Sequence, residues 1–116
     1  MRPLSEVAMF TQNVGEVADL IAAVTGLEPE YRSQGIAVFK HQGVAFLIHR
    51  AGGESDAGPP NVDHIAFASE DLDRTYQELT EKGFEFELPP QTYDWGRSAY
   101  LRDADGRMIE IQEKTE

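Results

Sequence analysis

The sequence predicts an α+β domain in which one order of elements occurs twice. Residues 6–26 contain a short apolar strand, a polar break, an amphipathic helix and a glycine, and residues 63–83 repeat that order. Phe10 falls where Phe67 falls when the two segments are superposed. Short alternating strands follow each helix. An internal repeat of this period predicts two similar modules.

Length and composition indicate one domain of 116 residues with a packed core, because 41% of the residues are hydrophobic. We expect the first module at residues 5–50, a Gly- and Pro-rich linker at 51–62 and the second module at 63–113. No apolar run approaches the roughly 20 residues that span a bilayer, and the N-terminus lacks the pattern of a signal peptide. The chain has no cysteine. We therefore expect a cytoplasmic protein without membrane contact.

The charge excludes one class of partner. The formal net charge is −11 and the pI is about 4.6. Nucleic-acid binding requires clustered Lys and Arg, so it is not expected. An acidic surface is compatible with a cationic ligand, and equally with solubility alone.

Two helices are predicted from apolar spacing and end signals. The first covers about residues 14–25, with Asn13 as N-cap and Glu16 completing a capping box. The second covers about residues 72–82, and acidic residues crowd its first turn. Gly26 and Gly83 suit the positions that end the two helices.

The strands alternate, which separates two faces. Large aliphatic residues should pack under the helices. The opposite face then carries His64, Glu110 and His49, and it is free to line a cavity. A shift of one residue would invert this arrangement. Residues 89–96 are expected to be irregular, and Asp103–Gly106 is expected to form a turn.

Longer motifs resemble a known superfamily. DHIAFASEDLDRTYQEL at 63–79, KGFEF at 82–86 and DWGRSAYLRDADGRMIEI at 94–111 resemble the vicinal oxygen chelate superfamily. This superfamily includes glyoxalase I, extradiol dioxygenases, fosfomycin-resistance enzymes and bleomycin-resistance proteins. The resemblance implies two tandem βαβββ modules whose mixed sheets curl into a cup around a small molecule, and it implies a homodimer.

The resemblance also implies positions for metal ligands on the first and last strand of each module. In the second module these positions match His64 and Glu110. In the first they match Val7, or Ala8 if the register shifts, and Leu47, none of which coordinates a metal. His49 is the best candidate for a third ligand, and Gln112 is a weaker one. The cofactor is therefore either absent or one divalent ion (Zn, Mn, Ni or Fe).

Other side chains are expected to contact a small molecule. Trp95 and Tyr93 would form an aromatic rim, or Trp95 would fill the core beneath its loop. The remaining candidates are two polar contacts and an apolar wall: Tyr100, Arg97, Met9, Leu47 and Val7.

Whether the protein is an enzyme stays open. The favoured hypothesis is a metal-free small-molecule-binding protein of the bleomycin-resistance type. The alternative is a divalent-metal-dependent lyase, isomerase or dioxygenase that uses His64 and Glu110. Even without a metal, Glu110 is the candidate catalytic residue, as a general base. A cup filled by its own side chains, acting through protein partners, is a third hypothesis.

Overall fold

The structure, a computed structural model, describes residues 1–52 and 61–114. It divides into two compact units. The N-terminal unit is Glu6–Asp63, and the C-terminal unit joins Met1–Ser5 to His64–Glu116. Most of the predicted linker, residues 53–60, lies outside the described residues.

Each unit contains one helix. The elements of the first repeat are β1 (Leu4–Thr11), α1 (Val14–Thr25), β2 (Tyr31–Arg32), β3 (Ile36–His41) and β4 (Val44–Arg50). The elements of the second are β5 (His64–Ser69), α2 (Leu72–Glu81), β6 (Phe86–Tyr93), β7 (Gly96–Arg102) and β8 (Met108–Glu113).

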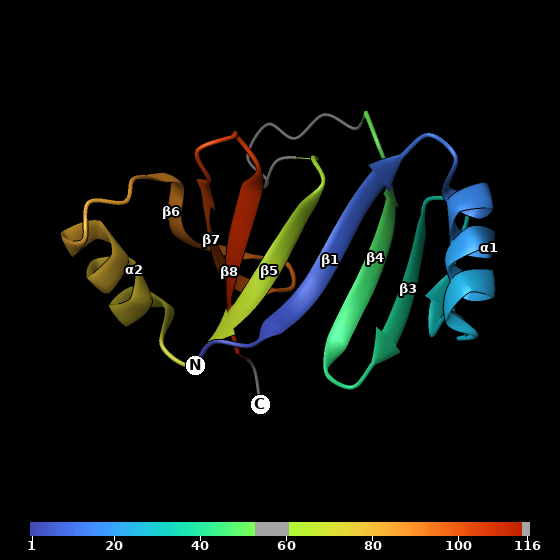
Figure 1. The fold of residues 1–116 in the computed structure, drawn as a ribbon, viewed down its shortest axis with the longest axis horizontal. Helices are drawn as coiled ribbons and strands as arrows, with labels where there is room; N and C mark the ends of the chain where they lie inside the picture. Colours follow the sequence, from blue (N-terminus) through green and yellow to red (C-terminus); the bar gives the residue numbers. More distant parts are fainter. Residues whose placement is uncertain (53–60, 115–116) are drawn as a thin grey trace. The chain divides into compact units, whose positions relative to one another are not determined.

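The order strand, helix, three strands therefore occurs twice, and the predicted α+β fold of two βαβββ modules is confirmed (Figure 1). The strand order is β2-β3-β4-β1 in the first repeat and β5-β8-β7-β6 in the second. The first strand of each repeat runs parallel to its last strand, and the β2–β3, β3–β4, β6–β7 and β7–β8 pairs are antiparallel. The curl of the two sheets into a cup concerns how the modules sit together, and it stays a prediction.

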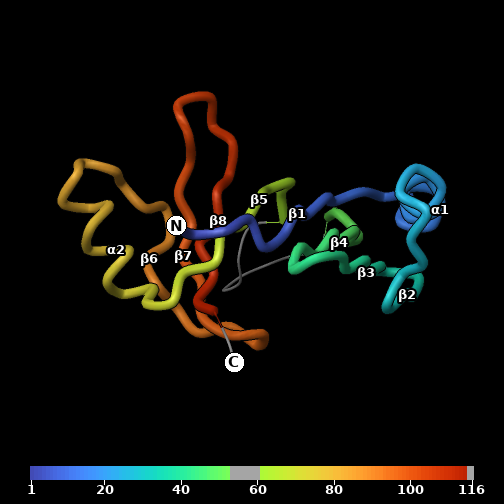
Figure 2. Tube along the Cα trace, turned by 60° about the horizontal axis from the view of Figure 1, so that its bottom comes forward, coloured from blue at the N-terminus to red at the C-terminus, as the bar shows by residue number. Residues whose placement is uncertain are grey.

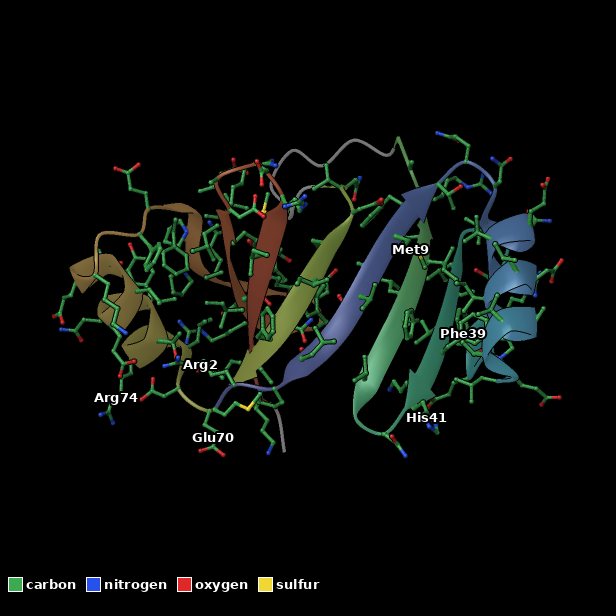
Figure 3. All side chains as sticks on the ribbon, in the orientation of Figure 1. Arg2, Met9, Phe39, His41, Glu70 and Arg74 are labelled. Atoms are coloured by element: carbon green, nitrogen blue, oxygen red, sulfur yellow. The ribbon has the colours of Figure 1, made fainter. Side chains whose placement is uncertain are left out.

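The core of the N-terminal unit lies between α1 and one face of β3 and β4 (Figure 1). Figure 3 labels Phe39, which is fully buried there. The apolar stripe of α1 supplies Val14 and Ala18, which pack with Phe39 and Ile48. Burying such side chains is the main favourable term in folding.

The C-terminal unit packs α2 against β6, β7 and β8. Leu72, Ala99 and Ile111 form its buried apolar cluster. The inner face of α2 is partly polar, because Thr75 is buried and its hydroxyl lies 2.7 Å from that of Ser69. Arg2, labelled in Figure 3, donates to Thr75 at 3.0 Å and to Glu78 at 2.9 Å, which ties the start of the chain to α2.

The two helices begin differently. Asp71 accepts a hydrogen bond from the Arg74 backbone N–H at 3.1 Å, as an N-cap should. Asn13 holds the N-cap position of α1, but its side chain makes no capping bond, so the predicted capping box is not formed. Gly26 ends α1 with φ of 75°, as predicted. Neither described helix is long and apolar enough to cross a bilayer.

Strand β6 corrects one prediction. Residues 89–96 were expected to be irregular, yet β6 continues to Tyr93 and β7 begins at Gly96. The pairing of β6 with β7 shifts between Leu88 and Gln91, so the two prolines between these residues fall in a bulge of the outermost strand of the order, where a missing N–H is tolerated. The predicted turn at Asp103–Gly106 is confirmed, and it closes the long β7–β8 hairpin seen in Figure 2.

Candidate functional site

Neighbouring parallel strands bring His64 and Glu110 together. In the β5–β8 register His64 is opposite Met108 and Ala66 is opposite Glu110. The His64 Nε2 atom lies 3.0 Å from Glu110 Oε1. The two residues are 9% and 1% exposed. The strand alternation predicted that these two residues share a face.

Ser98 completes the bonding of the buried carboxylate. Its hydroxyl donates to Glu110 Oε2 at 2.7 Å, and Ser98 is fully buried. A buried carboxylate without partners would be very costly, so these two bonds explain how the strand tolerates Glu110. The sequence analysis did not find Ser98. The alternation of β7 carried the signal, since Ser98 and Tyr100 are two residues apart and therefore share a face.

Three aromatic rings continue this face of the C-terminal unit. The Tyr100 ring stands edge-on to the His64 ring, with centroids 5.9 Å apart. The Tyr93 ring stands edge-on to Tyr100 at 6.1 Å. Tyr93 stacks on Trp95 at 4.8 Å with 7° between the planes. Trp95 remains 52% exposed, so it does not fill the core beneath its loop, and its role at the rim of a cavity stays a prediction.

The Tyr93 hydroxyl is unusual. Its oxygen is buried, and no described residue forms a hydrogen bond with it. Burial, and then the charge of nearby Glu110, raise the pKa of this hydroxyl above its ordinary value. Tyr93 is therefore a neutral O–H donor without an acceptor.

Two predicted ligand contacts lie elsewhere. Arg97 pairs with Asp73 at 2.8 Å and with Glu113 at 3.3 Å, so its side chain links β7 to α2 and does not join the Glu110 face. Met9, labelled in Figure 3, packs against the α1 core. It is opposite Ile48 in the β1–β4 register, on the face away from Leu47, because neighbouring strand residues alternate.

The other first-repeat candidates belong to the N-terminal unit. Leu47 is opposite Ala8 in the register. His49 packs its ring against Phe10 at 5.4 Å, and its Nδ1 lies 2.9 Å from the Arg50 carbonyl oxygen. Its role as a third metal ligand stays a prediction.

The strand registers identify a different residue as the counterpart of His64. Glu6 is opposite Ala45, two residues before Leu47. His64 is opposite Met108, two residues before Glu110. Glu6 therefore holds in the first repeat the position that His64 holds in the second.

The assignment of Val7 to that position is consequently wrong. Val7 is opposite Phe46, which packs against the α1 core. The repeats were superposed on Phe10 and on the glycines that end the helices, and Gly26 follows the start of α1 by one residue more than Gly83 follows the start of α2. Counting back from the N-caps would have found Glu6, since Asn13 and Asp71 each lie seven residues after the position in question.

Comparison with protein families agrees with this architecture. The model of the Glyoxalase/Bleomycin resistance protein/Dioxygenase superfamily matches residues 4–111. The chain belongs to this superfamily. A search of curated protein sequences finds no match.

Solved structures show the same fold at low identity. A hypothetical protein from Bacillus halodurans C-125 has a TM-score of 0.74 and 20% identity, covering 99% of this chain and 96% of that one. Methylmalonyl-CoA epimerase from Mycobacterium tuberculosis has a TM-score of 0.73 and 19% identity, covering 98% and 89%. The Streptomyces coelicolor epimerase in complex with 2-nitronate-propionyl-CoA has a TM-score of 0.66 and 17% identity, covering 98% of each chain.

Proposed function

We propose that this chain is a divalent-metal-dependent lyase or isomerase acting on a small organic molecule with two adjacent oxygen atoms. One observation carries the proposal: both repeats have an ionisable side chain at the same strand position, Glu6 in one and His64 in the other. The metal-free hypothesis relied on two residues that cannot coordinate a metal, Val7 and Leu47, at the ligand positions of the first repeat. Glu6 now replaces Val7 at one of these positions, so only Leu47 still supports that hypothesis.

The donor set fits a metal ion. His64 and Glu110 of the C-terminal unit can each offer one ligand atom, and so can Glu6 of the N-terminal unit. An imidazole with two carboxylates suits Mn²⁺, Fe²⁺, Ni²⁺ or Zn²⁺. Three protein ligands leave positions open for a substrate, as catalytic sites require. When bound, the ion would act as a Lewis acid that stabilises negative charge on substrate oxygens.

The surrounding residues would orient these ligands. The Ser98 hydroxyl donates to one oxygen of Glu110, and the Tyr100 ring packs almost perpendicular to the His64 ring. Such supporting contacts fix ligand geometry and typically change metal affinity by about 10–100-fold when removed. In this proposal Glu110 would release its bond to His64 when the ion binds. Binding by His64 and Glu110 would thus exchange one buried contact for another.

A second candidate is the metal-free binding protein, and one observation favours it. Both Glu110 oxygens already have partners, one near His64 and one at Ser98. A site satisfied in this way can bind a molecule through its aromatic rim alone. A small-molecule ligand and a homodimer are expected under both candidates.

Metal content and metal titration separate the candidates. The protein is purified without a histidine tag or chelator, its metal is quantified, and the apo form is titrated with Mn²⁺, Fe²⁺, Ni²⁺ and Zn²⁺ by calorimetry. We expect His64→Ala and Glu6→Gln each to weaken binding at least tenfold, about 1.4 kcal/mol. His41→Ala and Glu28→Gln, at exposed positions, are the matched controls.

Each contrary result has a definite meaning. Wild-type binding no tighter than about micromolar, roughly −8 kcal/mol, would retire the metal-dependent proposal and favour the binding protein. Metal binding that is lost in His64→Ala but unchanged in Glu6→Gln would remove Glu6 from the ligand set.

A further inference from the structure

The buried hydroxyl of Tyr93 is the polar atom that the site, as described so far, leaves unexplained. It is the buried side-chain oxygen without a hydrogen-bond partner among the described residues. A buried donor without a hydrogen bond costs free energy on the order of its desolvation penalty, and native structures contain few such groups. An acceptor from outside the chain would remove that cost.

The hydroxyl lies on the face that carries the candidate site. The Tyr93 ring contacts Tyr100, and the Tyr100 ring in turn contacts His64. Burial, and second the charge of Glu110, raise the pKa of the Tyr93 hydroxyl above its ordinary value. The proton therefore stays on the oxygen at neutral pH, and Tyr93 can donate a hydrogen bond.

The ring is also held in place. Trp95 stacks on one of its faces almost in parallel, and Tyr100 stands against it edge-on. A donor fixed in this way loses little conformational freedom when an acceptor arrives. Its position selects where on a ligand that acceptor must be.

We propose that Tyr93 binds the small molecule by donating its hydroxyl to a carbonyl or anionic oxygen of that molecule. The inference rests on the proposed function in one respect, that the same molecule contacts the metal ligands. Tyr93 then determines specificity, because a molecule with no acceptor at this place would leave the hydroxyl buried and unpaired.

The test compares Tyr93→Phe with Tyr31→Phe, a tyrosine that is 57% exposed in β2 of the N-terminal unit. Each manganese-loaded protein is titrated with acetohydroxamate, a small chelator with two adjacent oxygens. Calorimetry measures affinity, and the fluorescence of Trp95 reports contact at the rim because it is the single tryptophan of the chain.

We expect Tyr93→Phe to weaken acetohydroxamate binding at least tenfold, about 1.4 kcal/mol. Its manganese affinity should match that of the wild type, and its melting temperature should not fall, since the lost hydroxyl has no partner in the described chain. Tyr31→Phe should leave all three quantities unchanged.

Unchanged acetohydroxamate affinity in Tyr93→Phe would overturn the inference while leaving the metal-dependent proposal intact. A lower melting temperature would also overturn it, because the hydroxyl would then have a structural role. If the wild type binds no metal, the proposed function fails, and the same acetohydroxamate titration on the apo protein then tests the role of Tyr93. Apo binding that Tyr93→Phe loses would support the inference, and no binding by the apo wild type would end it.

Discussion

The two units share an order of elements but bury different kinds of side chain. The N-terminal unit packs Val14, Ala18, Ala37, Phe39 and Ile48 into an apolar core. The buried polar and charged residues of the described chain all lie in the C-terminal unit: His64, Ser69, Thr75, Ser98 and Glu110.

The difference shows how a repeated fold can divide its tasks. Buried polar groups are tolerated only when they are bonded, and in the C-terminal unit they bond one another, Ser69 with Thr75 and Glu110 with His64 and Ser98. The N-terminal unit is therefore stabilised mainly by apolar packing, while the C-terminal unit holds the buried polar side chains from which a site can be built.

The largest expected effect concerns the two cores. Phe39 is fully buried, whereas Phe86, which packs against the apolar cluster of the C-terminal unit, is only partly buried. Phe39→Ala should lower the free energy of unfolding by about 3–5 kcal/mol, and Phe86→Ala should lower it by less. Urea unfolding followed by circular dichroism measures both. Equal losses would mean that the cores are closer in packing than the burial of these rings indicates.

The next effect would make the repeats more alike. Leu47 holds the position that Glu110 holds in the other repeat. Under the metal-dependent proposal, Leu47→Glu adds a carboxylate as a fourth protein ligand. Manganese affinity should therefore rise at least tenfold, about 1.4 kcal/mol. Leu20→Glu, at a residue that is 61% exposed on α1, is the control. If calorimetry gives the same affinity for both variants, the equivalence of the two positions does not extend to metal binding.

A smaller effect separates the helix ends. Asp71→Ala removes the bond to Arg74 N–H and should cost about 1 kcal/mol. Asn13→Ala removes no capping bond, so its cost should be clearly smaller. Thermal denaturation of both variants measures the difference. A loss for Asn13→Ala that equals the loss for Asp71→Ala would show that Asn13 caps α1 in solution.

The smallest effect depends on pH. Arg97 donates hydrogen bonds to the exposed carboxylate of Asp73, which lowers the pKa of Asp73 from its ordinary value. A carboxyl with a depressed folded-state pKa stabilises the protein above its unfolded-state pKa, and that stabilisation is lost as the pH falls through the folded-state value. Asp73→Asn should therefore lower the melting temperature slightly at neutral pH and not at all in strong acid. Asp94→Asn, at an exposed position, is the control; a deficit that persists in acid would mean that the pair is not the cause.

Much of the fold could be predicted from local signals. The apolar stripe of α1, the glycines after both helices and the alternation around His64 and Glu110 each specify structure within a few residues. The longer motifs within residues 63–111 added a resemblance to the superfamily, which the family match confirms. The two βαβββ modules that this resemblance implied are present.

The errors came from positions where one residue matters. The position of Glu6 was assigned to Val7, or Ala8, because α1 is longer than α2. A helix absorbs an extra residue as a rise of about 1.5 Å, whereas a shift of one residue in a strand inverts its faces. Ser98 was missed although its spacing from Tyr100 in β7 placed both on one face, whereas the burial of the Tyr93 hydroxyl depends on pairings between distant strands. The bulge in β6 likewise depends on its place at the end of the strand order.

The turn between β3 and β4 has a consequence for how the chain folds. Only Gln42 and Gly43 separate the paired residues His41 and Val44, and both have positive φ, 51° and 83°. A two-residue turn of this kind matches the twist of a hairpin, which can form in about 1–10 μs. Pairing of β4 with β1 must instead close a loop across the helix, so we expect the hairpin to be an early folding unit. Gln42→Gly, which relieves the left-handed position, should then raise the folding rate more than it lowers the unfolding rate in a stopped-flow experiment.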